Sequence, residues 1–111
     1  MKAFITAILV LTLVSYQNEI TFSNSFEDDL KYFKVNPRNI ELIMDNIQIA
    51  LLKKYPDGGM VKVKGTQYSV KENGYNQQVM FGIEVKTSSG KHRYIVKFSG
   101  DGKKTVTFNL E

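Results

Sequence analysis

The stretch NPRNIELIMDNIQIALLKKYPDGG, residues 36–59, decides the fold because it contains a complete helix with its start and its stop. Asn36 suits the cap position, and Pro37 suits the first helical position, where its missing N–H breaks no hydrogen bond. Apolar residues recur with the helical period at Ile40, Ile43, Ile47, Ala50 and Leu51. Pro56 and the glycine pair after it end the helix. The apolar side is broad enough to predict that a sheet covers most of this helix.

After Gly59 the apolar residues recur at every second position, which is the period of a strand with one buried face. The clearest run is VMFGIEV, residues 79–85, and residues 94–98 and 106–110 repeat the alternation. An earlier strand, residues 60–70, changes phase around Gly65, as a β-bulge would require. Turn sequences separate these runs at Asn73-Gly74, Ser88-Ser89-Gly90 and residues 99–103.

Strands joined by such short turns are antiparallel neighbours. We therefore predict an α+β domain over residues 36–111, in which one long helix packs on a four- to five-stranded antiparallel β-meander. The optional fifth strand is Ile20–Phe22. It falls in an N-terminal segment, residues 17–35, where Ser25 is expected to open a short helical turn.

Residues 1–16 have the outline of a secretory signal peptide. Lys2 precedes an apolar run, AFITAILVLTLV, that is shorter than the roughly 20 residues of a membrane-spanning helix. We therefore expect a secreted or periplasmic protein without a membrane span once the leader is removed. The chain has no cysteine, which excludes disulfides, thiol nucleophiles and cysteine-based metal sites.

Positive charge is concentrated in the second part of the chain. Residues 17–59 hold five basic and seven acidic side chains, whereas residues 60–111 hold nine basic and four acidic ones. Charge that alternates with apolar residues is typical of the solvated face of a sheet. The same face could meet an anionic surface or a glycan. Its candidate members are Lys62, Lys64, Lys86, Arg93 and Lys97.

The sequence contains no constellation typical of catalysis, of a cofactor or of a metal. His92 is the sole histidine, and its neighbours Lys91 and Arg93 offer neither metal ligands nor a nucleophile. The turn GDGKK, residues 100–104, joins two strands and does not open a helix, so it is not a phosphate loop. Phe81, Tyr94, Phe98 and Phe108 fall on the apolar face, which leaves only Tyr68 and Tyr75 to stack on bases, so no nucleic acid partner is expected. We predict a non-catalytic binding protein whose partner is another protein.

In its order of signal peptide, long helix and antiparallel strands, the chain resembles the cystatin family. The motif match is QVMFG, residues 78–82, against the family's Gln-x-Val-x-Gly, with Met80 in place of the valine. In that family an N-terminal segment and two hairpin loops form a wedge that plugs papain-like cysteine proteases. The resemblance implies that the partner would contact Gln78, Met80, Gly82, Gly100, Asp101, Gly102 and Lys103.

Two features of the cystatin pattern are missing. Residues 17–36 contain no glycine to match the one before the family's helix, and the chain has no tryptophan for the Pro-Trp pair of the second loop. Inhibition of papain-like cysteine proteases through a hairpin wedge is therefore the alternative function. Small exported PepSY-like modules are similar to the chain in architecture.

Overall fold

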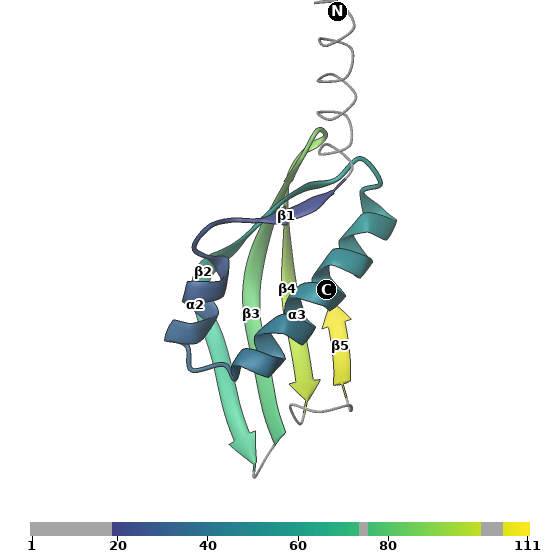
Figure 1. The fold of residues 1–111 in the computed structure, drawn as a ribbon. Helices are drawn as coiled ribbons and strands as arrows, with labels where there is room; N and C mark the ends of the chain where they lie inside the picture. The colour runs from purple at the N-terminus through teal and green to yellow at the C-terminus, as the bar shows by residue number, and fades with distance from the viewer. Residues whose placement is uncertain (1–18, 74–75, 101–105) are drawn as a thin grey trace, which may run out of the picture.

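A computed structural model describes residues 19–73, 76–100 and 106–111. The predicted signal peptide, residues 1–16, lies outside the described residues, and so do Asp101, Gly102 and Lys103. Along the chain the elements are β1 (Ile20–Phe22), α2 (Phe26–Tyr32), α3 (Pro37–Lys54), β2 (Gly59–Asn73), β3 (Asn76–Thr87), β4 (Gly90–Gly100) and β5 (Val106–Leu110). Both helices lie over one face of a curved sheet (Figure 1).

The strands form one sheet in the order β1-β2-β3-β4-β5. From β2 to β5 each strand is antiparallel to the next, and the β3–β4 turn closes on the pair Thr87 and Gly90 as predicted. β1 instead runs parallel to β2, with Ile20 opposite Gly59 and Phe22 opposite Val61.

The predicted fold class, one long helix on an antiparallel meander, is therefore wrong, although the domain is α+β. The described residues form two helices, and the sheet is mixed because β1 is parallel to its neighbour. Parallel strands need a long crossover connection, and residues 23–58, which contain both helices, supply it. The segment Ile20–Phe22 is too short to reveal this direction from its sequence.

Helix α3 begins after the predicted cap Asn36 and ends before the predicted stop at Tyr55 and Pro56. The Asn36 side chain accepts a hydrogen bond from the Arg38 N–H at 2.9 Å, and Pro37 is the first helical residue. The side facing the sheet buries Asn39, Ile40, Ile43, Ile47 and Leu51. Ala50, which the sequence placed in this stripe, is only half-buried.

The short helix α2 is stabilised by the packing of its side chains against the rest of the domain. Phe26 and Leu30 are fully buried, and the Phe26 ring lies 4.7 Å from that of Phe22 and 6.2 Å from that of Phe81, measured between centroids. A helix of seven residues is marginal in isolation, so these contacts explain why it forms. They also attach the N-terminal segment to the sheet.

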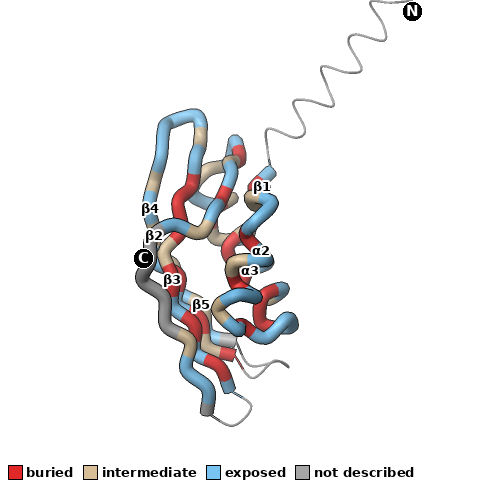
Figure 2. Tube along the Cα trace, turned by 90° about the vertical axis from the view of Figure 1, so that its left-hand side faces the viewer, coloured by how far each residue is buried: buried red, intermediate tan, exposed pale blue. Residues whose placement is uncertain are grey.

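The predicted irregularity around Gly65 is confirmed. Val63 pairs with Ile83, but the next pair joins Tyr68 to Phe81, so the chain takes five steps along β2 against two along β3. The extra residues change the phase of β2 and bend it, as bulges do. Seen from the side, the helices occupy one side of the sheet and leave its other side uncovered (Figure 2). We call this uncovered side the outer face.

Candidate binding surface on the outer face of the sheet

Strand β3 shows how the two faces divide. Its odd-numbered residues Val79 to Val85 are buried against the helices, whereas Gln78, Met80 and Lys86 are exposed on the outer face. Alternation along a strand produces this division, and the strand pairing extends it to the neighbours. Residues paired with the outward residues of β3 therefore lie on the same face.

The register brings the predicted basic residues together. On β2 and β4, Lys62 and Arg93 both pair with Glu84, and Lys97 pairs with Met80. The complete set of outer-face cations among the described residues, all of them exposed, is Lys62, Lys64, Lys71, Lys86, Lys91, Arg93 and Lys97. The sequence prediction named five of them and missed Lys71 and Lys91. The described carboxylates of this face are Glu84 and Glu111, so positive charge dominates it.

Glu84 is a buried acid on this otherwise exposed face, with only 5% of its surface accessible. Its Oε1 lies 3.6 Å from Lys62 Nζ and its Oε2 lies 3.9 Å from Arg93 Nε. Burial raises the pKa of Glu84, but the charges of Lys62, Lys64 and Lys91 outweigh it, so this pKa lies below its usual value. Glu84 is thus ionised at neutral pH and holds its cationic neighbours in place across three strands.

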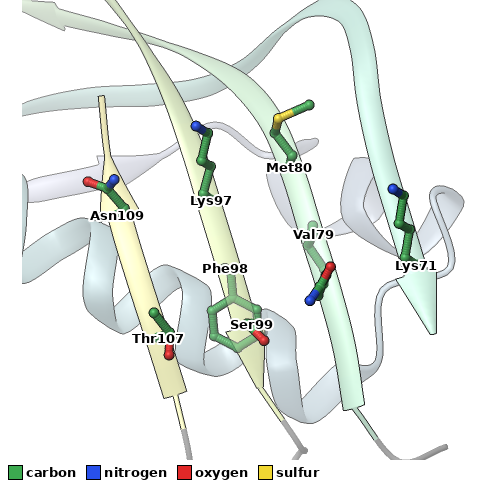
Figure 3. A pocket seen from close by; sticks show the side chains of 9 residues that line it. Lys71, Val79, Met80, Lys97, Phe98, Ser99, Thr107 and Asn109 are labelled. Atoms are coloured by element: carbon green, nitrogen blue, oxygen red, sulfur yellow. The ribbon is translucent and has the colours of Figure 1, made fainter. Parts of the chain in front are cut away.

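A groove of about 420 Å³ lies on the outer face, across β2 to β5 (Figure 3). Met80 lines one end of it and is 40% exposed, with Lys97 on the neighbouring strand β4 and Lys71 on β2 at the opposite side of the groove. Thr107 and Asn109 of β5 and Gln78 of β3 complete its rim, while most of the lining is apolar. Lys97 Nζ also contacts Glu111 Oε2 at 3.1 Å. Within the described part of the chain, Lys71 has no ion pair.

The motif residues that the resemblance assigned to a partner divide into two groups. Gln78 and Met80 lie at the groove, beside Lys97. Gly82 instead lies under the irregular part of β2, where a Cβ atom would be 2.6 Å from the Lys64 carbonyl oxygen. Its lack of a side chain is thus explained by the close approach of two strands.

Gly100, the predicted start of a partner-binding turn, is a buried residue that ends β4. A Cβ atom there would be 2.7 Å from the Phe98 ring and 3.2 Å from Asn39 Oδ1. Packing against these two side chains therefore requires glycine at this position.

Gln77, the residue just before the motif, has a role that the sequence did not reveal. It is buried, and its Oε1 accepts hydrogen bonds from Asn36 N–H at 2.9 Å and Asn39 Nδ2 at 3.0 Å. Its Nε2 donates to the Lys34 carbonyl at 3.0 Å and to Glu72 Oε1 at 3.2 Å. Gln77 therefore attaches the start of α3 to β3.

His92 belongs to an aromatic cluster at the end of α3. Its ring stacks on that of Tyr55 with centroids 4.8 Å apart, and its Nε2 lies 3.1 Å from Ser89 Oγ and 3.3 Å from Thr87 Oγ1. The Tyr55 and Tyr94 hydroxyls share a hydrogen bond. Burial and this bond raise the pKa of Tyr94 to about 12. Tyr94 is therefore protonated at neutral pH and acts as a hydrogen-bonding partner of the helix end.

Within residues 19–73, 76–100 and 106–111, no three His, Asp or Glu side chains lie close enough to hold a metal ion. None of the helices in these ranges combines the length and the apolar character needed to cross a membrane. Comparisons with protein-family models, with curated proteins and with solved structures found no match.

Proposed function

We propose that this chain is an exported, non-catalytic binding protein whose outer face takes an acidic surface of another protein. The observation that carries the proposal is the distribution of charge on that face. The outer face carries seven exposed cations and two carboxylates, both already engaged in ion pairs, and neither helix covers this face. Such an excess attracts negatively charged partners and speeds their association. Export rests on the signal-peptide pattern of residues 1–16.

A binding role suits the chemistry of the described residues better than catalysis does. The imidazole of His92 is packed against Tyr55 and bonded to two hydroxyls, with no described carboxylate to orient it. Tyr94, with its raised pKa, is a poor base at neutral pH.

An acidic protein fits the outer face better than a nucleic acid does. Nucleic acid binding uses exposed aromatic rings on which bases stack. Phe81 and Phe98 are buried and Tyr94 is on the helix side, so the described aromatic side chains leave the outer face without a stacking platform. A glycan would need only the cations, and the apolar groove beside them favours a polypeptide.

Neutralising cations that have no described ion pair tests the proposal while both ion pairs of Glu84, with Lys62 and Arg93, stay in place. The purified variant Lys64→Gln/Lys86→Gln/Lys91→Gln is titrated with fluorescent poly-L-glutamate at low salt, and heparin serves as a second probe. We expect the affinity for poly-L-glutamate to fall about tenfold, since exposed ion pairs contribute about 0.2–1 kcal/mol each.

The control is Lys31→Gln/Lys34→Gln/Lys53→Gln, which removes the same charge from exposed positions on the helix side and, at Lys31, also an exposed ion pair with Glu27. It is expected to change the affinity less than twofold, a small effect of net charge alone. Equal losses in both variants would reject the outer face as the binding surface. Binding of heparin without binding of poly-L-glutamate would reject the protein partner and favour a glycan.

The alternative, inhibition of papain-like cysteine proteases, has one supporting observation. Gln77 pairs with Gly100, so the connection before β3 and the connection after β4 leave the sheet at the same end, as a wedge of two hairpins requires. Titration of papain with the purified protein tests it. A fully active protease at roughly micromolar protein, well above the Kd of a specific complex, would exclude inhibition.

A further inference from the structure

We infer that the groove around Met80 receives an apolar side chain of an acidic peptide segment, an inference that rests on the binding function proposed above. The groove is mostly apolar, although it lies among the cations of the outer face. Met80 pairs with Lys97, and Lys71 is opposite the adjacent Gln78. Positive charge therefore lies on both sides of an apolar depression (Figure 3).

The chemistry of the groove defines the kind of peptide segment that would fit it. A segment with an apolar residue between acidic residues would place its apolar side chain on Met80 and on the methylene groups of the lysines, which can cover apolar surface while their ammonium groups reach water. Its carboxylates would reach Lys71 on one side and Lys97 on the other. Lys97 already contacts Glu111, so it can hold a carboxylate, and a peptide carboxylate would replace or share this exposed ion pair. The volume of about 420 Å³ is within the usual range for ligand pockets.

Met80 also suits a variable partner. Methionine is unbranched and polarizable, so it adapts to apolar side chains of different shapes. We therefore expect selectivity for apolar over polar side chains, with weak discrimination among leucine, methionine and phenylalanine.

Two pentapeptides test the inference on the purified protein. One has leucine between two pairs of glutamates, and the other has serine in place of the leucine. We expect the leucine peptide to bind about tenfold more tightly, because only it buries apolar surface in the groove. Met80→Ser should remove most of that difference.

Met60→Ser is the matched control, since Met60 is 52% exposed on the same face but does not line the groove. It should leave the preference for leucine unchanged. Equal binding of both peptides, weakened by the cation substitutions, would overturn the groove inference and leave the proposed function standing. If neither peptide nor poly-L-glutamate binds, both proposals fail.

Discussion

Two adjacent glutamines, Gln77 and Gln78, show how differently neighbouring residues of a strand act. Gln77 points toward the helices and bonds to three groups around the start of α3 and to Glu72 of β2, whereas Gln78 is exposed at the groove. The sequence motif emphasised Gln78. The residue that matters most for the fold is expected to be Gln77, because buried polar groups that lose their partner are costly.

We therefore expect Gln77→Ala to lower the free energy of unfolding by about 2–3 kcal/mol, since it leaves the Asn36 N–H and the Asn39 amide without their acceptor. Gln78→Ala is the control and should change it by less than about 0.5 kcal/mol. Urea unfolding followed by circular dichroism measures both. Equal effects of the two substitutions would contradict the assigned role of Gln77.

Glu84 provides a prediction about pH. Because its pKa is lowered in the folded protein, its contribution to stability is present above the ordinary value of 4.5 and is lost as the pH falls through the lowered pKa. Glu84→Gln should therefore be less stable than the unchanged protein at neutral pH. The difference should disappear in acid, where both side chains are neutral.

Urea midpoints measured from about pH 7 down to about pH 2 check this expectation. Asp45→Asn, on the exposed side of α3, is the control and should leave the midpoint nearly unchanged at neutral pH. A difference between Glu84→Gln and the unchanged protein that persisted undiminished in acid would show that the charge of Glu84 is not the stabilising feature.

Among the elements, α3 is the one whose orientation the sequence predicted best. Ile43 is completely buried and Ile49, on the same helix, is 59% exposed. Ile43→Ala should therefore cost about 2–5 kcal/mol through lost burial and a cavity, whereas Ile49→Ala should cost less than about 0.5 kcal/mol. Urea unfolding of the two variants measures the contrast. Similar losses would mean that the helix is rotated relative to the described packing.

Long periodic elements could be predicted because their burial pattern repeats. The 18 residues of α3 and the alternation of β3 and β4 each give several independent signals. The three residues of β1 and the seven of α2 give too few, and both depend on contacts such as that of Phe26 with Phe81. Local sequence indicated a helical turn after Ser25, but the parallel pairing of β1 and the stability of α2 follow from tertiary packing.

The candidate surface was predictable to a similar degree. Alternation alone placed five cations on one face, and the strand pairing puts Lys62, Lys86, Arg93 and Lys97 beside outward residues of the same sheet. The close approach at Gly82 and the position of Lys71 opposite Gln78 at the groove depend on how β2 shifts its register between Val63 and Tyr68. A bulge can be predicted from a change of phase, but the number of extra residues and their path cannot.

For the whole molecule, the charges are divided between its two layers. Residues 19–59, which form the helices with β1, carry more acidic than basic side chains, and the outer face carries the opposite excess. The charge distribution of the protein is therefore asymmetric, with the basic side facing away from the helices. An acidic partner would approach that side first, and its association would slow as salt is added.

The most direct test of the central claim, that the outer face is the binding surface, is an NMR titration of the isotope-labelled protein with poly-L-glutamate. We expect the amide signals of Lys64, Met80, Lys86 and Lys97 to shift together, with their changes lost at high salt. Signals from the exposed side of α3, such as that of Asp45, should remain in place. Shifts concentrated on α3, or spread evenly over both layers, would contradict the claim.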